Sequence, residues 1–293
     1  FVQQCIESLL GQTYSNLEFI IVDDNSSDNT EQTVKELLKN TTNRLKFIKT
    51  SGKRGPGLNK RLGWSHIKGK YVIFLDDDDY FVSKTFIATA IKAFQADSTL
   101  SVVAFNSYQE IVEEKKLVVT KSLHPLEKVI TSKEILKDFM INIDKPNSTF
   151  PAVFDVEKMV QHQINSMKIL NDTQIWLRGF FSGNVLFLGD YVGVYRIHKG
   201  SIGYNLDVNY ILDNVDEKVR LYCSEGFPIK EEKWLKQQVL ITLNHYFVKS
   251  STVKYLAVVK WIYKNFSFIT SIQLISTLLN TRARFFVKKM LNN

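Results

Sequence analysis

Apolar residues follow two alternating spacings along the first hundred residues. Phe1–Leu10 has the spacing of an amphipathic helix, and the continuous apolar run Leu17–Val22 predicts a strand buried on both faces. The alternation continues with predicted strands at 45–48, 71–75 and 100–105, and predicted helices ending near 39, running from 56 through 67, and at 84–94. Strands that alternate with helices predict the α/β class, with a mostly parallel sheet flanked by helices.

The pattern changes after the first hundred residues. Residues 107–205 are less regular, with a predicted helix at Asp172–Phe181 and a strand-like pair, VLFLG and YVGVYRI. After Asn205 the spacing becomes helical and the charge balance becomes basic. We therefore expect three parts, at 1–106, 107–205 and 206–293.

Composition and charge narrow the class of protein. The apolar fraction of 44% is that of a soluble globular protein, and the formal net charge of +8 indicates an anionic partner. Cys5 and Cys223 have no metal-ligand spacing, which favours free thiols in a reducing compartment. The first residues are not typical of a signal peptide, and no uncharged apolar run reaches the roughly 18 residues of a membrane span. These observations predict a cytoplasmic protein.

Two acidic clusters directly follow predicted strands: Asp23–Asp24, and the run Asp76–Asp79. Ligands of such sheets bind beyond the carboxyl ends of strands, so we expect both clusters at the ligand edge. Four adjacent carboxylates repel one another unless a cation or hydrogen bonds compensate, and hard carboxylate oxygens suit Mg²⁺ or Mn²⁺. A solvated turn is the alternative. An EF-hand is excluded, because Phe81 and Ile87 stand where its glycine and glutamate belong.

The loop GKRGPGLNK lies at a predicted helix start. It lacks the ending of a Walker phosphate loop, and Lys60 stands where a dinucleotide fingerprint needs its third glycine. A basic loop at a helix start is suited to phosphate contacts. The alternative for Lys53 and Arg54, and the more common one for such residues, is that they are simply solvated.

Three stretches together resemble the inverting family 2 glycosyltransferases of the GT-A fold. They are QTYSNLEFIIVDDNSSDNT, GPGLNKRLGWSHIKGKYVIFLDDDDY, and NDTQIWLRGFFSGNVLFLGDYVGVYRIHKGSI. Each motif alone is weak, but the order and spacing of the first two over about eighty residues are specific. The resemblance covers roughly the first 205 residues. It implies a nucleotide-sugar-binding half at 1–106 and an acceptor-binding half at 107–205.

The resemblance also implies a role for individual residues. Asp172 would be the catalytic base that takes the proton from the acceptor hydroxyl; without the resemblance, an acid at a helix start is more simply a cap. The donor-binding residues would be Asp23, Asp24, Arg54, Asn59, Asp76, Asp79 and Arg196. Mn²⁺ or Mg²⁺ would be held by Asp76, Asp78 and His198, although a lone histidine is more often structural. Trp176 is expected in the core rather than as a sugar platform.

The sequence departs from the family in two places. Asn171 stands where many relatives have glutamate, which leaves Asp172 as the only acid of that pair. Relatives also have an apolar strand and a nucleotide-contacting turn before the segment that begins here at Phe1. We therefore expect the first strand to be missing from this sequence.

The expected function is metal-dependent transfer of a hexosyl or N-acetylhexosaminyl group, with inversion, from a UDP-sugar to a hydroxyl of a glycan, lipid-linked or protein-linked acceptor. A sugar nucleotidyltransferase and a non-enzymatic basic binding protein stay open as alternatives. Nucleic acid is not expected as a partner, since the acidic turn would repel phosphates. The basic C-terminal helices either pack on the domain or contact a membrane surface, which would be the inner face of the plasma membrane.

Overall fold

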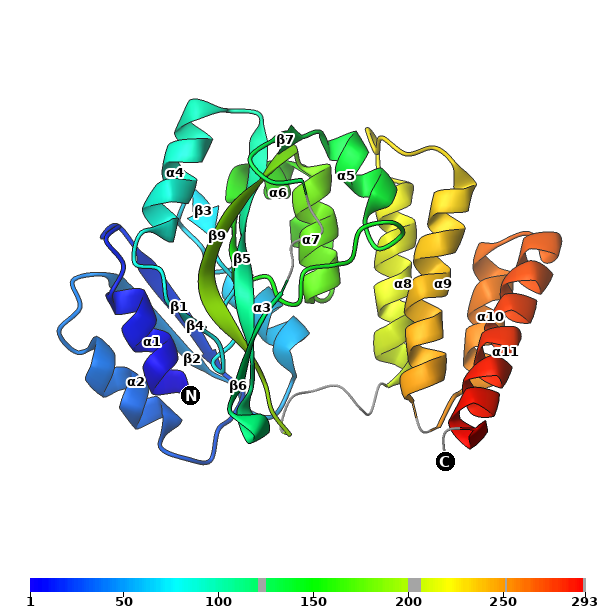
Figure 1. Cartoon of the computed structure of the whole chain (residues 1–293), viewed down its shortest axis with the longest axis horizontal. Helices are drawn as coiled ribbons and strands as arrows, with labels where there is room; N and C mark the ends of the chain where they lie inside the picture. The colour runs from blue at the N-terminus through cyan, green and yellow to red at the C-terminus, as the bar shows by residue number, and fades with distance from the viewer. Residues whose placement is uncertain (121–124, 200–206, 251, 292–293) are drawn as a thin grey trace. The chain divides into compact units, whose positions relative to one another are not determined.

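The protein divides into two compact units. The computed structural model describes residues 1–120, 125–199, 207–250 and 252–291 (Figure 1). The first unit is Phe1–Phe139 with Ile143–Lys199, and the second is Met140–Asn142 with Gly200–Asn293. The predicted division between 106 and 107 falls inside a strand of the first unit, and the predicted boundary near 205 lies outside the described residues.

The helices and strands of the first unit follow the predicted order. In chain order they are α1 (Val2–Leu10), β1 (Glu18–Asp23), α2 (Thr30–Leu38), β2 (Arg44–Lys49), α3 (Pro56–Trp64), β3 (Tyr71–Val72), β4 (Tyr80–Phe81), α4 (Phe86–Ala96), β5 (Leu100–Ile111), β6 (Lys116–Val119), β7 (Val129–Ile130), α5 (Ser132–Asp138), β8 (Ala152–Asp155), α6 (Val156–Gln161), α7 (Asp172–Phe181) and β9 (Asn184–Ile197). Single 3-10 turns lie at Val112–Glu114 and Ile164–Ser166. α7 has the predicted bounds, whereas the predicted strand at 71–75 is hydrogen-bonded only at its first two residues.

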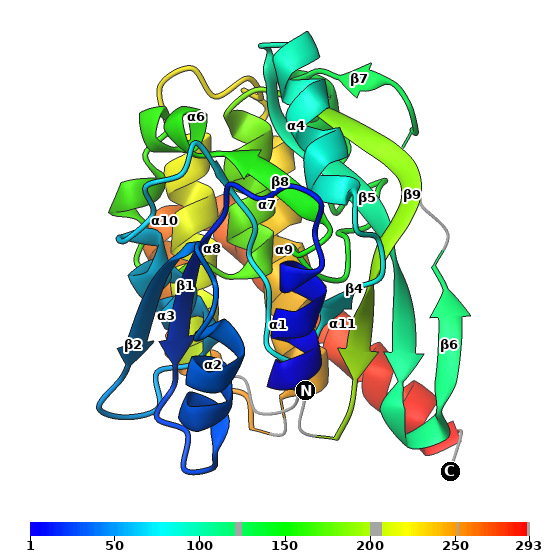
Figure 2. The same ribbon diagram turned by 90° about the vertical axis from the view of Figure 1, so that its left-hand side faces the viewer.

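The strands form two sheets in the described residues. β1 and β2 make a parallel pair, and a larger sheet has the order β3-β8-β5-β9-β4, with β6 on β5 and β7 on β9 (Figure 2). The α/β class is confirmed, but the sheet is mixed rather than mostly parallel. Among the described strands of the larger sheet, only β5 and β9 are a parallel pair. A parallel pair needs a long crossover, whereas β6 returns beside β5 after a single turn and therefore runs antiparallel to it.

Two apolar clusters pack beneath the elements that carry the acidic residues, β1 and the turn before β4. α1 packs on α2 and β1, with Ile6, Phe19 and Val34 all buried. The larger cluster lies between α4 and β5 and includes Phe81, the residue that ends β4. Trp176 of α7 is fully buried, so it is a core residue, as expected, and not a sugar platform.

Within the part of the second unit that the structure describes there are four helices, α8 (Val208–Tyr222), α9 (Glu232–Lys249), α10 (Tyr255–Asn265) and α11 (Phe268–Leu291). α9 packs on α8 and α11, and α10 packs on α11 (Figure 1). Both cysteines of the chain are free thiols, Cys5 buried and Cys223 exposed. Among the described residues, no helix combines the length and apolarity needed to cross a membrane.

Candidate active site

The acidic run forms the turn between β3 and β4. Its backbone closes with the N–H of Asp79 donating to the carbonyl of Asp76 at 3.2 Å. α1 supports the turn from outside: the Ser8 hydroxyl accepts the N–H of Phe81 at 3.0 Å, and the Cys5 thiol lies 3.7 Å from the Asp76 carbonyl. The turn therefore has a fixed conformation, as a ligand-binding segment needs.

Arg196 of β9 holds this turn from the other side. Its backbone N–H donates to Asp79 Oδ1 at 2.9 Å, and its Nη1 donates to the Asp78 carbonyl at 2.8 Å. Its Nε donates to Glu110 at 2.9 Å, and its Nη2 contacts Gln4. The guanidinium thus positions the acidic turn. The predicted contact of Arg196 with the donor stays a prediction.

Asp79 is the most enclosed acid of the run. It is 0% exposed, and its Oδ2 has no hydrogen-bond partner among the residues that the structure describes. Burial raises the pKa of Asp79 to about 8, and the charges of Asp78 and Asp76 act in the same direction against the hydrogen bond from Arg196. A neutral Asp79 at pH 7 removes one of the four like charges, which lowers the repulsion within the turn.

Lys60 of α3 joins two predicted site residues that are far apart in sequence. Its Nζ donates to Asp76 at 3.1 Å and to Asp172 Oδ1 at 2.9 Å. Burial of the amine acts to lower its pKa, but the two carboxylates outweigh burial and raise it above its ordinary value. One ammonium thus balances the first acid of the turn and the acid at the start of α7.

Asp172 has the ionisation state that a general base requires. Burial alone would raise the pKa of Asp172, but the positive charges of Lys60 and Lys145 outweigh burial and hold it below its ordinary value. The helix cap is supplied by the neighbouring residue, because Asn171 Oδ1 accepts the N–H of Gln174 at 3.0 Å. Asp172 does not supply that cap, so its carboxylate is directed to Lys60.

The three predicted metal ligands are only partly assembled. His198 Nε2 lies 3.1 Å from Asp78 Oδ2, whereas the carboxylate of Asp76 is paired with Lys60. Within the described residues, no three acidic, histidine or cysteine side chains form a ready metal cluster. One carboxylate and one imidazole still fit Mg²⁺ or Mn²⁺, because such ions commonly take their remaining ligands from substrate phosphates and water.

The second acidic cluster organises the basic loop before α3. Asp24 accepts the backbone N–H groups of Arg54 at 2.8 Å and Gly55 at 2.9 Å. Partial burial acts to raise the pKa of Asp24, and these hydrogen bonds lower it below the ordinary value. Gly55 has φ of 82°, a conformation that favours glycine. In the described structure Asn59 Oδ1 is buried without a hydrogen-bond partner, which leaves an acceptor available to a ligand.

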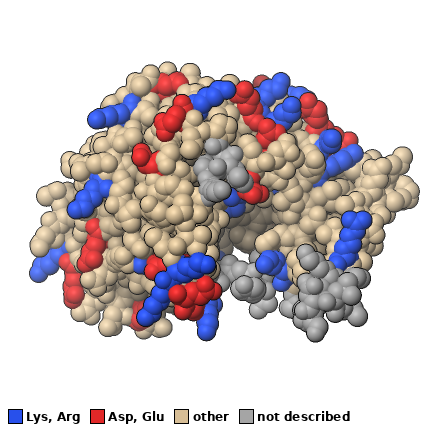
Figure 3. Space-filling view, viewed as in Figure 1, with Lys and Arg blue, Asp and Glu red and all other residues tan. Residues whose placement is uncertain are grey.

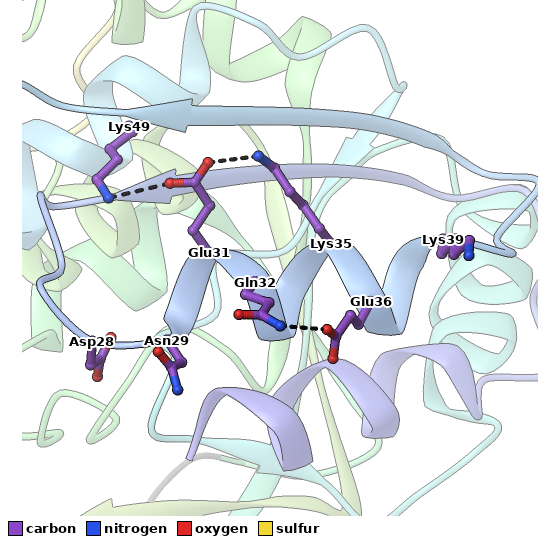
Figure 4. Close-up of a pocket in the computed structure, with 8 residues that line it drawn as sticks. All are labelled: Asp28, Asn29, Glu31, Gln32, Lys35, Glu36, Lys39 and Lys49. Carbon is purple, nitrogen blue, oxygen red and sulfur yellow. Dashed lines mark hydrogen bonds and ion pairs between the residues drawn. The ribbon is translucent and has the colours of Figure 1, made fainter.

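Asp23 lies at the end of β1 and is 5% exposed. Its Oδ1 accepts the N–H of Ser26 at 3.1 Å, and its Oδ2 lies 3.7 Å from the ammonium of Lys49. Lys49 also reaches Glu31 of α2 at 3.2 Å, at the edge of a surface recess along that helix (Figure 4). Glu31 pairs with both Lys35 and Lys49 in this recess, and none of the predicted site residues lines it.

The structure brings the predicted residues into two groups. Asp76, Asp78, Asp79, Asp172, Arg196 and His198 surround the acidic turn, and Asp23, Asp24, Arg54 and Asn59 lie along β1 and the basic loop. Lys60, which pairs with two acids of the first group, follows Asn59 of the second group directly on α3. Sequence reasoning missed four supporting residues, namely Lys60, Lys145, Glu110 and Gln4. The run of four aspartates was the one signal in the sequence that positively charged side chains should lie close to the turn.

The α/β fold of the first unit is of the GT-A type, and in it the Lys60 ammonium links the acidic turn to Asp172 at the start of α7. Residues 1–152 match glycosyl transferase family 2, and the chain belongs to that family, as the resemblance implied.

Similar proteins agree with this assignment. The chain is 28% identical over 204 residues to a GalNAc(5)-diNAcBac-PP-undecaprenol beta-1,3-glucosyltransferase of Campylobacter jejuni, covering 68% of this chain and 61% of that enzyme. It is 22% identical over 253 residues to glycosyltransferase GlyA of Streptococcus pneumoniae, covering 82% of this chain and 35% of GlyA. The crystal structure of S. aureus TarS 1-349 in complex with UDP-GlcNAc superposes with a TM-score of 0.66 over 98% of this chain and 85% of TarS, at 17% identity. At that identity the superposition shows the fold alone.

Proposed function

We propose that the protein transfers a hexosyl or N-acetylhexosaminyl group, with inversion, from a UDP-sugar to an acceptor hydroxyl. The observation that carries the proposal is the pairing of Lys60 with both Asp76 and Asp172. This pairing sets an ionised carboxylate next to the acidic turn where the family binds its donor. A base adjacent to a donor site is the arrangement that single-displacement sugar transfer requires.

The donor side of the proposal rests on two observations. The TarS structure of the same fold contains UDP-GlcNAc, and this chain has Asp78 and His198 side by side at the turn. Asp78 and His198 would hold Mn²⁺ or Mg²⁺, with Asp76 joining if it leaves Lys60. A divalent cation there would neutralise the charge that develops on the departing diphosphate.

The acceptor side assigns the proton transfer to Asp172. Its carboxylate takes the proton from the acceptor hydroxyl while that oxygen forms a bond to the anomeric carbon. The bond from the anomeric carbon to the diphosphate oxygen breaks on the opposite face, and UDP leaves with the electron pair. Because Lys60 and Lys145 lower the pKa of Asp172, the base is ready at neutral pH.

The proposed acceptor is a glycan on a lipid diphosphate. The Campylobacter relative is named for an undecaprenol-diphosphate-linked glycan and a beta-1,3-glucosyl product. We extend that acceptor class to this chain, with a role in cell-surface polysaccharide synthesis; free-glycan and protein-linked acceptors are the other outcomes of the test.

The test is an acceptor-dependent release of UDP. The full chain is incubated with Mn²⁺, one of a set of UDP-hexoses or UDP-N-acetylhexosamines, and a GlcNAc on a short isoprenyl diphosphate, and the product linkage is read by NMR. We expect a β product from an α-linked donor. A retained configuration, or no UDP release with any donor and acceptor, would contradict the proposal.

Asp172→Asn should lower kcat by about 10²- to 10⁴-fold, the usual contribution of a general base. UDP affinity should change far less than kcat, because the substitution leaves Asp76 and Asp78 in place, although it also removes the charge that pairs with Lys60. Asp144→Asn, at an exposed acid of the same unit, is the matched control and should retain activity. Equal loss in both variants would argue against a catalytic Asp172.

A further inference from the structure

Positive charge is concentrated in the last part of the chain. Ten of the 38 Lys and Arg residues, and none of the 30 Asp and Glu residues, lie between Lys233 and Asn293. The net charge of +8 is therefore carried by this segment, since the residues before it contain slightly more acids than bases. An extended segment of single-sign charge indicates an interaction with an anionic surface.

The same segment leaves apolar side chains in solvent. On α10, Leu256 is 67% exposed and Tyr263, seven residues further on the same helical face, is 44% exposed. Exposed lysines border this stripe at 254, 260 and 264. The opposite face of α10 is buried through Val258 and Ile262, so the exposed stripe is not the one that packs within the unit.

α11 continues this surface. Phe268, Ile269 and Ile272 are 68%, 71% and 48% exposed, and Leu279 follows on the same face. The ring of Phe268 lies 6.1 Å from the ring of Tyr263, which joins the two stripes. Figure 3 shows the end of the second unit formed by α10 and α11 as a broad uncharged surface with Lys or Arg side chains beside it.

We propose that α10 and α11 dock the protein on the surface of an anionic lipid bilayer. Exposed aromatic and branched apolar residues would enter the boundary between headgroups and acyl chains, and the bordering lysines would contact acidic headgroups. The contact is interfacial, because no described helix is able to cross a membrane. Lipid binding is measured without donor or acceptor, so this inference stands apart from the proposed function.

Charge complementarity selects the bilayer over a second copy of the chain. Two copies joined through this face would bring the lysines of α10 close to their equivalents, and like charges across an interface oppose association. An anionic bilayer meets both properties of the surface, since it accepts apolar side chains and attracts ammonium groups.

The experiment is co-sedimentation of the full chain with vesicles of phosphatidylcholine, with and without phosphatidylglycerol. The Phe268→Glu/Ile269→Glu double variant should lower the partition coefficient about tenfold or more, because it removes two exposed apolar anchors. Lys254→Gln, Lys260→Gln and Lys264→Gln should each lower binding to anionic vesicles about fivefold at low salt. Leu117→Glu/Val119→Glu, at exposed apolar positions of β6, is the matched control and should bind like the parent chain.

Three outcomes decide the proposal. Salt-sensitive binding to anionic vesicles that the α11 variant loses, while its circular dichroism spectrum stays that of the parent, supports it. No vesicle binding by the parent chain overturns it. A parent dimer in light scattering that the α11 variant dissociates, without vesicle binding, also overturns it and assigns the surface to a second copy.

Discussion

Lys60 occupies the position where a bound cation would be expected in a site so rich in carboxylates. It contacts Asp76 and Asp172 at 3.1 and 2.9 Å and is itself largely enclosed. Removing one partner of such an ionic group leaves buried charges uncompensated, which is usually costly. Lys60 is therefore a positioning residue in the absence of donor, and any cation that binds both acids has to compete with it.

The Lys60→Met variant should bind Mn²⁺ in the absence of nucleotide more tightly than the parent, on the order of tenfold. The reason is that Asp76 and Asp172 lose the ammonium that neutralises them. Isothermal titration measures the change, with Lys46→Met, an exposed lysine of β2, as control. An unchanged or weaker Mn²⁺ affinity would count against competition between Lys60 and a metal.

At the scale of elements, β9 connects the acidic turn to the centre of the sheet. It runs parallel to β5, and its Val194 and Gly193 pair with the two residues of β4 that follow the acidic run. A Cβ built on Gly193 would lie 2.5 Å from Phe150 and 2.7 Å from the carbonyl of Tyr80. The close approach of β4 to β9 therefore requires glycine at this position.

Gly193→Ala should destabilise the fold by about 1–3 kcal/mol, because the new methyl group overlaps a backbone oxygen that is fixed by the sheet. Gly189→Ala in the same strand is the control, since its Cβ would meet its neighbours at ordinary distances of 3.5 and 3.7 Å. Urea unfolding of both variants gives the difference. Equal stability of the two variants would show that β4 is able to move away from β9.

The helix pair α8–α9 contains a buried lysine that makes the stability of the protein depend on pH. Lys218 is 1% exposed, and its Nζ donates to the carbonyl and to Oε1 of Gln238 at 3.0 and 3.1 Å. Burial lowers the pKa of Lys218 from 10.5 to about 7. Between these two values the unfolded chain binds a proton that the folded chain does not, so stability rises with pH over this range.

The free energy of unfolding should therefore increase by about 2 kcal/mol from pH 7 to pH 9 on account of Lys218. Lys218→Met should abolish this part of the slope, whereas Lys260→Met on the exposed face of α10 should retain it. Urea melts at the two pH values provide the measurement. Asp79, with its pKa of about 8, acts in the opposite direction over the same range in the parent and in both variants, so the slopes are compared between proteins. A slope that is the same in the parent and in Lys218→Met would contradict a neutral Lys218.

At the scale of the whole molecule, the sequence predicted where the acidic site residues lie along the fold, but not which side chains pair with them. Asp23 and the Asp76–Asp79 run follow apolar strands in both the pattern and the structure, because a buried strand and the polar turn after it are local features. Arg196 and Glu110 are 86 residues apart, and Lys60 and Asp172 are 112 apart, so no local pattern could pair them. The mixed sheet was missed for a related reason: an apolar run predicts a buried strand but carries no information on its direction.

The net charge of +8 is unevenly distributed between the two units. The acidic turn lies in the first unit, whereas the second unit contributes most of the excess of lysine and arginine. A protein with this distribution is suited to a negatively charged donor that is bridged by metal, and separately to an anionic surface. These are the two partners that we propose.

Calorimetric titration of UDP, with and without Mn²⁺, measures whether the acidic turn forms a metal-dependent donor site. The parent chain and Asp78→Asn are compared, with GDP as the control nucleotide. The account predicts Mn²⁺-dependent binding of UDP by the parent, and its loss in Asp78→Asn while the fold is retained. UDP binding that is independent of Mn²⁺ and unaffected by Asp78→Asn, or no UDP binding by a well-folded chain, would contradict a metal-dependent donor site at the acidic turn.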